Sequence, residues 1–197
     1  MSETQTITIQ PACAPDDEAS LILAAQHNPA LFQAIYERWA APVYRYFHFR
    51  TGETESAEDL TSQLFLSAYQ ALPRYRHQGH FAAWLFTIAR NQVKEYYRKR
   101  AREVPLVQAE RLASPADPLA EVARADEIRC LRKLILQLPD AEQELIRLRY
   151  VAGLSFADMA IILNRREDAV KKNLYRLQAR LQTALLSVSP PEQNHDQ

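Results

Sequence analysis

Residues 155–181 read SFADMAIILNRREDAVKKNLYRLQARL, and their spacing predicts two helices joined by a tight turn. The apolar positions recur every three or four residues in both halves, as on the buried face of an amphipathic helix. Ser155 and Asp158 form a capping pattern that begins the first helix, over 155–163. The second helix, over about 166–187, follows after a brief turn. A short helix, a tight turn and a basic helix are typical of a helix-turn-helix.

The second helix of this pair has an apolar face and a cationic face. At about 100° per residue, one side of it would pack on Phe156 and Leu163 of the first helix. The apolar positions on that side are Val170, Leu174, Leu177 and Leu181. The basic side chains nearly opposite are Arg165, Lys172, Arg176 and Arg180. Because Arg and Lys bind both phosphates and the acceptor edge of guanine, the pattern favours DNA binding over an amphipathic surface helix with a solvated charged face.

A second basic segment, WLFTIARNQVKEYYRKRAR at 84–102, begins apolar and ends cationic. Its first turns are expected in a core and contain Trp84, Leu85, Ile88 and Ala89. A polar strip at helical spacing follows, formed by Arg90, Asn91, Lys94 and Arg98. The loop before the helix adds Tyr75, Arg76, His77 and His80. Cations beside aromatic rings suit a single nucleic-acid strand whose bases stack on the rings. The alternative is a helix end whose cations complement the negative end of its own dipole.

Composition and charge limit the classes of protein to which this chain can belong. The chain has 197 residues, 47% of them hydrophobic, so it can bury a core, and its 24 basic and 24 acidic side chains cancel. The global charge therefore identifies no partner. Two distant cysteines, Cys13 and Cys130, favour reduced thiols over a disulfide framework or a zinc site. With neither a signal-peptide pattern nor a long apolar run, a cytoplasmic location without direct membrane insertion is expected.

Three glycines and no sustained period-two pattern indicate an all-α fold. The helices expected from periodicity and capping cover 17–26, 29–50, 56–72, 80–102, 119–138, 141–151, 155–163 and 166–187. Within them, Leu31 is expected on a buried face and Asp140 as the cap of the helix over 141–151. The resulting organisation has two small helical domains between disordered tails, joined by a flexible, proline-containing linker. The ranges are 1–15 for the first tail, 16–102 for the first domain, 103–118 for the linker, 119–187 for the second domain and 188–197 for the second tail.

Two stretches carry a resemblance to a known family. Residues 59–100, DLTSQLFLSAYQALPRYRHQGHFAAWLFTIARNQVKEYYRKR, resemble region two of bacterial RNA polymerase sigma factors of the extracytoplasmic-function group. Residues 138–181, LPDAEQELIRLRYVAGLSFADMAIILNRREDAVKKNLYRLQARL, resemble region four of the same group. The two motifs occur in the family's order and separation, and nothing between them resembles region three. This combination is far more specific than a helix-turn-helix alone.

The resemblance implies a transcription initiation factor that binds RNA polymerase core, recognises the −35 and −10 elements of promoter DNA and promotes melting. Region two would dock on the clamp helices of the core and region four on its flap. The residues facing the clamp helices would be Asp59, Ser62, Gln63 and Leu66. The −10 element would be bound by Tyr75, Arg76, His77, Arg90, Asn91, Lys94 and Arg98. The −35 element would be bound by Arg166, Glu167, Lys171, Lys172, Arg176 and Arg180. The resemblance also implies an anti-sigma protein as a regulator.

The chain departs from the family pattern at two places. Ser62 and Gln63 stand where the group often has a Gln-Glu pair, and Ala169 and Asn173 replace a Thr or Ser and an Arg. The DNA sequence of the −35 element therefore cannot be carried over from the family to this chain. A degenerate sigma-like protein that binds core without initiating transcription is an alternative interpretation.

Two further readings come from other classes. A stand-alone helix-turn-helix regulator would explain the second domain but would leave the first without a role. An enzyme is disfavoured because the sequence has no phosphate-binding loop, nucleophile elbow or zinc-protease motif, and we expect no cofactor and no small-molecule substrate. His77 and His80 alone are too few ligands for a metal site.

Overall fold

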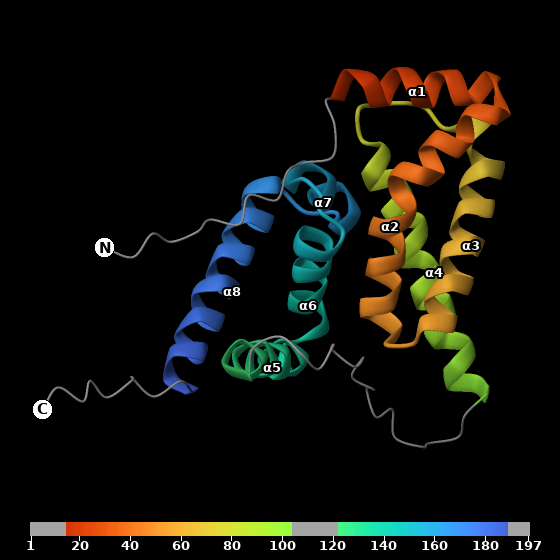
Figure 1. The fold of residues 1–197 in the computed structure, drawn as a ribbon. Coiled ribbons are helices and arrows are strands. Elements are labelled where there is room, and N and C mark those ends of the chain that lie inside the picture. The colour runs from red at the N-terminus through yellow and green to blue at the C-terminus, as the bar shows by residue number, and fades with distance from the viewer. Residues whose placement is uncertain (1–14, 104–121, 189–197) are drawn as a thin grey trace, which may run out of the picture.

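The computed structural model describes residues 15–103 and 122–188, and all regular structure in these residues is helical. Figure 1 shows two groups of helices, α1 to α4 and α5 to α8, which lie side by side. The predicted all-α fold in two helical regions is confirmed. The predicted tails, 1–15 and 188–197, and the linker, 103–118, lie outside the described residues except at their boundaries.

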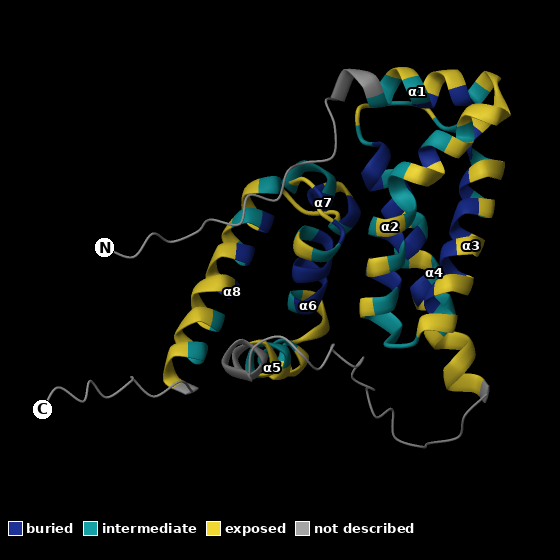
Figure 2. Ribbon diagram, viewed as in Figure 1, coloured by how far each residue is buried: buried dark blue, intermediate teal, exposed yellow. Residues whose placement is uncertain are grey.

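The first group is a bundle of three long helices with a shorter one across its end (Figure 1). Its elements are α1 (Pro15–His27), η1 (Pro29–Leu31), α2 (Phe32–Thr51), α3 (Thr54–Ala71), η2 (Leu72–Arg74) and α4 (Phe81–Glu103). Tyr46, Phe47, Leu64 and Phe86 are fully buried where the long helices meet. Figure 2 shows the buried residues on the inward faces and the exposed residues on the outward faces of these helices, as the amphipathic spacing requires.

The segment predicted as one helix over 29–50 begins instead with a separate 3₁₀ turn, η1. Asn28 caps this turn by accepting a hydrogen bond from the backbone N–H of Ala30 at 3.2 Å. The prediction that Leu31 lies on a buried face is wrong, since its side chain is 37% exposed. A 3₁₀ turn places three residues per turn, so an apolar face extrapolated from α-helical spacing misplaces Leu31.

The second group consists of α5 (Val122–Gln137), α6 (Asp140–Ile146), η3 (Arg147–Val151), α7 (Phe156–Leu163) and α8 (Glu167–Val188). The helix predicted over 141–151 is α6 followed by η3, which winds as a π-helix. Asp140 is not its cap; Pro139 takes that position, and Asp140 is the first helical residue. Its carboxylate binds Arg50 and Arg147 instead, because two guanidinium groups outcompete a backbone N–H for a carboxylate.

The helix-turn-helix is built as predicted. The Ser155 hydroxyl accepts a hydrogen bond from the backbone N–H of Asp158 at 3.1 Å and so begins α7. Asn164 ends α7 in the left-handed conformation, with φ of +51°. On α8, Val170, Leu174 and Leu177 are buried, which confirms the predicted apolar stripe.

The left-handed residue at this turn gives a stability prediction. Asn164→Ala is expected to lower the free energy of unfolding by about 1 kcal/mol, because alanine disfavours positive φ more than asparagine does. Asn164→Gly is the matched control and should stay within a few tenths of a kcal/mol, since glycine adopts this conformation readily. Urea unfolding followed by circular dichroism measures both. Equal losses in the two variants would show that the Asn164 side chain, not its backbone angle, matters.

The two groups share an extensive contact. The buried apolar side chains of both form one contiguous cluster, which runs from Ile22 in α1 to Leu174 in α8. The contact is made chiefly by α4 against α7 and by α2 against η3. Within 15–103 and 122–188, no helix has the length and apolarity needed to cross a lipid bilayer.

Candidate nucleic-acid and partner interfaces

The outward face of α3 carries the residues predicted to bind a protein partner. Asp59, Ser62, Gln63 and Leu66 are all exposed, and Leu66 is exposed to 60% although it is apolar. They follow one another at helical spacing, opposite the buried face that contains Leu64. The structure therefore brings all four together in one strip, hereafter the α3 strip.

Aromatic side chains that the sequence analysis missed extend the α3 strip. Tyr69 is 45% exposed on α3, and Tyr36 is 46% exposed on the neighbouring α2. Their rings are held edge-on, Tyr69 against Phe32 at 5.1 Å and Tyr36 against Phe65 at 4.6 Å between centroids. Large rings fixed at a surface are characteristic of protein interfaces, where they lose little conformational entropy on binding. Their place outside the buried positions of two amphipathic helices was the signal in the sequence.

The loop before α4 is held in place from both sides. The Tyr75 ring lies 4.7 Å from that of Trp84 and 5.6 Å from that of Phe81, between centroids. The Gln26 side chain of α1 donates hydrogen bonds to the carbonyls of Leu72, at 3.0 Å, and Tyr75, at 2.5 Å. Burial raises the pKa of the Tyr75 hydroxyl. Tyr75 is thus part of a fixed aromatic wall.

The other predicted loop residues differ in exposure. Arg76 projects into solvent and His77 is half-buried. The His80 Nδ1 lies 3.1 Å from a carboxylate oxygen of Asp158 in α7, so this histidine contacts the second group. In the described part of the chain, no three His, Cys, Asp or Glu side chains gather closely enough to hold a metal ion.

The polar strip predicted on α4 is divided by the structure. Asn91, Lys94 and Arg98 are exposed, and Arg98 also pairs with Glu95 at 2.5 Å. We call these three residues the α4 strip. Arg90, predicted to belong with them, turns toward the second group, where its Nη1 donates to the Ile162 carbonyl at 2.8 Å.

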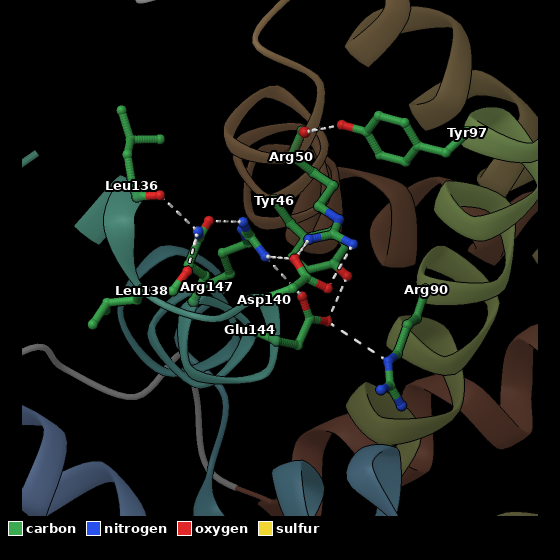
Figure 3. Close-up of polar contacts among 10 residues, drawn as sticks. Tyr46, Arg50, Arg90, Tyr97, Leu136, Leu138, Asp140, Glu144 and Arg147 are labelled. Atoms are coloured by element: carbon green, nitrogen blue, oxygen red, sulfur yellow. Dashed lines mark hydrogen bonds and ion pairs between the residues drawn. The ribbon is translucent and has the colours of Figure 1, made fainter. Parts of the chain in front are cut away.

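The aromatic residues at the basic end of α4 bind the protein itself. The Tyr96 hydroxyl lies 3.0 Å from that of Ser56, and the Tyr97 hydroxyl donates to the Arg50 carbonyl (Figure 3). Arg100 binds the Glu53 carboxylate at 3.0 Å, and a hydrogen bond from Ser56, with that from Arg100, keeps the pKa of Glu53 low. These contacts fix the end of α4 against the α2–α3 corner. Tyr97 is nevertheless 41% exposed, so its ring at the basic end of α4 and the wall at Tyr75 before the other end are both aromatic surfaces of this region.

The exposed face of α8 carries most of the cations predicted for duplex DNA. Arg166, Lys172 and Arg176 are exposed. Lys171 is paired with Glu167 at 2.7 Å, and that hydrogen bond raises the pKa of its ammonium group. Arg180 binds Glu142 of α6 at 2.7 Å. Within residues 15–103 and 122–188, three of the six predicted residues are cations without an ion-pair partner, and the other three form ion pairs on the surface.

Tyr175 is a residue of this face that the sequence analysis missed. It is 57% exposed, and its ring lies edge-on to Phe156 at 6.0 Å between centroids. It lines a shallow depression together with Asp168, Lys171, Lys172, Arg176 and Ala179. We call this depression the α8 face. An aromatic residue opposite the stripe of Val170 and Leu174 was the signal that could have found it.

Comparison with known proteins supports the family suggested by the motifs. The model for Sigma-70 region 2 matches residues 35–103, and the model for Sigma-70 region 4 matches residues 128–181. The ECF RNA polymerase sigma factor BldN of Streptomyces coelicolor is 35% identical over 165 residues, which cover 79% of this chain but only 61% of BldN. The ECF RNA polymerase sigma factor SigM of Bacillus subtilis is 30% identical over 148 residues, which cover 75% of this chain and 90% of SigM.

A solved structure shows the same fold. The sigma factor RpoE of Bartonella quintana, crystallised with the anti-sigma factor NepR, has a TM-score of 0.58 and 23% identity; the match covers 90% of this chain and all of RpoE. The predicted resemblance is confirmed. With regions 2 and 4 present in this order and such identity to SigM over most of both chains, the chain belongs to the ECF family of RNA polymerase sigma factors.

Proposed function

We propose that this chain is a transcription initiation factor that attaches to RNA polymerase core, recognises two promoter elements and promotes strand opening. The observation that carries the proposal is that one chain presents three separate exposed surfaces: the α3 strip, the α4 strip and the α8 face. The first has the chemistry of a protein interface and the other two that of nucleic-acid interfaces. A stand-alone regulator would need only the α8 face. The domains assigned to these tasks are 16–102 and 119–187.

The α3 strip is assigned to the clamp helices of polymerase core. Leu66, Tyr69 and Tyr36 offer an apolar and aromatic centre, and Asp59, with Ser62 and Gln63, offers a polar rim. This arrangement is common at protein interfaces, where a few central side chains provide most of the binding energy. Region four is assigned to the flap of the same enzyme.

The α4 strip is assigned to the non-template strand of the −10 element. Lys94 and Arg98 carry charge for the phosphates, and Asn91 offers an amide for a base edge. Unstacking a base costs a few kcal/mol, which favourable contacts with a preformed protein surface can offset. The fixed wall of Tyr75 and Trp84 is such a surface, so opening needs no ATP.

The α8 face is assigned to the major groove of the −35 element. Lys172 and Arg176 are the free cations nearest Tyr175, so these three side chains are the candidates for base edges and adjacent phosphates. Lys171 and Arg180 would exchange a carboxylate for a phosphate. Because this exchange gains little net energy, they contribute less than Lys172 and Arg176.

We also propose a regulatory partner and a cellular location for this chain. An anti-sigma protein is proposed as the partner that restrains this chain, as in the Bartonella quintana complex of similar fold. A factor that must meet polymerase and chromosome acts in the cytoplasm, which is therefore its proposed location.

Runoff transcription with purified core polymerase on a library of promoter sequences tests the function directly. We expect transcripts from a subset of templates that share two elements about 25 base pairs apart, and promoter affinity that rises strongly when core is added at fixed salt. A degenerate sigma-like protein would bind core without yielding transcripts. A stand-alone regulator would protect DNA equally with and without core, and either result would contradict the proposal.

A further inference from the structure

We propose that α1, a helix with no assigned contact to DNA, determines how strictly the −10 interface selects bases, and that Gln26 is the residue responsible. Gln26 is a positioning residue, because it acts through the loop between η2 and α4 and not on DNA itself. The selection of bases by this loop rests on the function proposed above. The fixing of the loop rests on contacts within the protein alone.

Gln26 joins α1 to the start of this loop. Its half-buried side chain donates hydrogen bonds from Nε2 to the carbonyls of Leu72, at 3.0 Å, and Tyr75, at 2.5 Å. A side-chain amide has two N–H donors, so one glutamine can make both bonds. Figure 1 shows that α1 lies across the end of the bundle and that the segment after α3 passes directly beneath it.

The two carbonyls lie where the chain leaves regular structure. η2 ends at Arg74, and the last carbonyls of a helix have no hydrogen-bond partner within it. Residues 75–80 form no helix, so helical hydrogen bonds do not determine their course. The backbone N–H of Tyr75 donates to the Leu72 carbonyl at 3.0 Å, which is a local contact. The bonds from Gln26 instead bridge 46 and 49 positions of the chain, so they anchor the first residue of the loop to the bundle.

The position of Tyr75 affects the rest of the loop. Its ring lies 4.7 Å from that of Trp84 and 6.0 Å from that of His77, between centroids. Burial raises the pKa of the Tyr75 hydroxyl, and a backbone hydrogen bond from Gln78 acts against this rise. The residue that Gln26 holds thus contacts both the later part of the loop and the first turn of α4. A displacement of Tyr75 would therefore move the aromatic wall and the neighbouring loop residues together.

α1 is itself a firm support for Gln26. Ile22 and Ala25 of α1 are buried in the core cluster. Near the beginning of the helix, the Glu18 carboxylate accepts a hydrogen bond from Nε1 of Trp39 at 3.1 Å. Helical spacing places Glu18, Ile22 and Ala25 on the same side of α1 as Gln26. α1 therefore presents Gln26 to the loop from a fixed backbone.

A fixed loop matters more for selectivity than for affinity. Lys94 and Arg98, the cations assigned to the −10 strand, lie on α4, so they can bind phosphates whatever the position of the loop. Discrimination between bases depends instead on close contacts, and one mismatched base typically weakens binding about 5- to 150-fold. Such contacts are most effective when the protein surface is already in place before the base arrives. A loosened loop should therefore discriminate less while phosphate binding persists.

Gln26→Met tests the proposal in the holoenzyme. Methionine is an unbranched side chain of similar length without an N–H donor, so packing is kept and both hydrogen bonds are lost. Selectivity is measured as the ratio of opening rates on a promoter found by runoff transcription and on versions with one −10 base replaced. Because a neutral hydrogen bond changes an equilibrium about two- to tenfold, we expect selectivity to fall about fivefold. Core affinity should change less than about twofold.

Gln137→Met, at the exposed end of α5, is the matched control and should leave selectivity unchanged. A residue that only stabilised the bundle would slow opening equally on all promoters. An unchanged ratio in a folded, core-binding Gln26→Met variant would therefore overturn the proposal, while transcription by the parent holoenzyme would still support the proposed function.

A double-mutant cycle identifies the path from Gln26 to DNA. If Gln26 acts through Tyr75, Gln26→Met should lower selectivity less than about twofold in a Tyr75→Leu background, because coupled residues are not additive. A full fivefold loss in that background would contradict an effect through the loop.

Hydrogen exchange in the free chain tests the fixing of the loop without any promoter. The amides of Tyr75 and Gln78 are hydrogen-bonded in the structure. We expect both to exchange about threefold faster or more in Gln26→Met than in the parent, because the loop opens locally more often. Equal exchange in the two proteins would refute the role of Gln26, even where the parent holoenzyme opens no promoter and the proposed function fails.

Discussion

Replacing Asn91 and Lys94 with alanine is expected to slow open-complex formation by the holoenzyme about 100-fold, while its affinity for polymerase core changes less than about twofold. Both side chains are exposed on the α4 strip, away from the core of the bundle. A hydrogen bond to a neutral group contributes about 0.5–1.5 kcal/mol and one to a charged group about 1.5–3 kcal/mol. Their combined loss, about 2–4.5 kcal/mol, corresponds to roughly 30- to 2,000-fold in the opening equilibrium.

Lys99→Ala is the matched control for this variant. It removes an exposed cation from the same helix, about 140° around the axis from Lys94. Opening rates come from stopped-flow fluorescence of a labelled −10 element, and core affinity comes from a separate titration. Equal losses of opening and core binding would indicate misfolding, and a control as defective as the double variant would show that total charge, not the α4 strip, matters.

Reversing two charges on the α8 face has the second large expected effect. The double variant Lys172→Glu, Arg176→Glu should weaken holoenzyme binding to a duplex −35 fragment at least 100-fold. Both cations are exposed and free of the ion pairs that occupy Lys171 and Arg180. Removing a side chain that binds a base or a phosphate costs about 1–3 kcal/mol, and each introduced carboxylate repels the backbone.

The salt dependence of DNA binding distinguishes lost direct contacts with phosphates from a change in the overall electrostatic field of the protein. The measured quantity is the slope of the logarithm of the binding constant against the logarithm of the salt concentration. This slope should become less steep by about one unit for each phosphate that the variant no longer binds. Lys133→Glu, on the exposed surface of α5, is compared with Lys172→Glu because it changes the same charge elsewhere in the second group. Equal effects of these two single variants would place the −35 interface away from the α8 face.

Local periodicity accounts for the parts of the fold that the sequence predicts well. The stripe of Val170, Leu174 and Leu177, the cap at Ser155 and the chain reversal at Asn164 each depend on residues within a few positions of one another. Their structure is therefore encoded in short segments, and the helix-turn-helix follows from them. The exposed α3 strip can be predicted from the sequence for the same reason, because all its residues lie on one face of a single helix.

The partners of charged side chains cannot be predicted from short segments of sequence in this way. Arg90 has the spacing of the α4 strip, yet its guanidinium binds α7 and lies near Glu144. Asp140 has the sequence of a cap, yet its carboxylate binds Arg50, 90 positions away. These pairings depend on how the two helical groups meet, which no short segment specifies. Functional assignments that rest only on the helical spacing of cations therefore fail where a cation pairs with a residue distant in the sequence.

Permanganate probing of a promoter identified by runoff transcription tests the central claim most directly, because the reagent oxidises unpaired thymines. With holoenzyme bound and no ATP present, the account predicts reactive thymines in the −10 element and toward the start site, and a sharp loss of that reactivity in the Asn91→Ala, Lys94→Ala variant. Thymines that stay unreactive while holoenzyme occupies the promoter would contradict it.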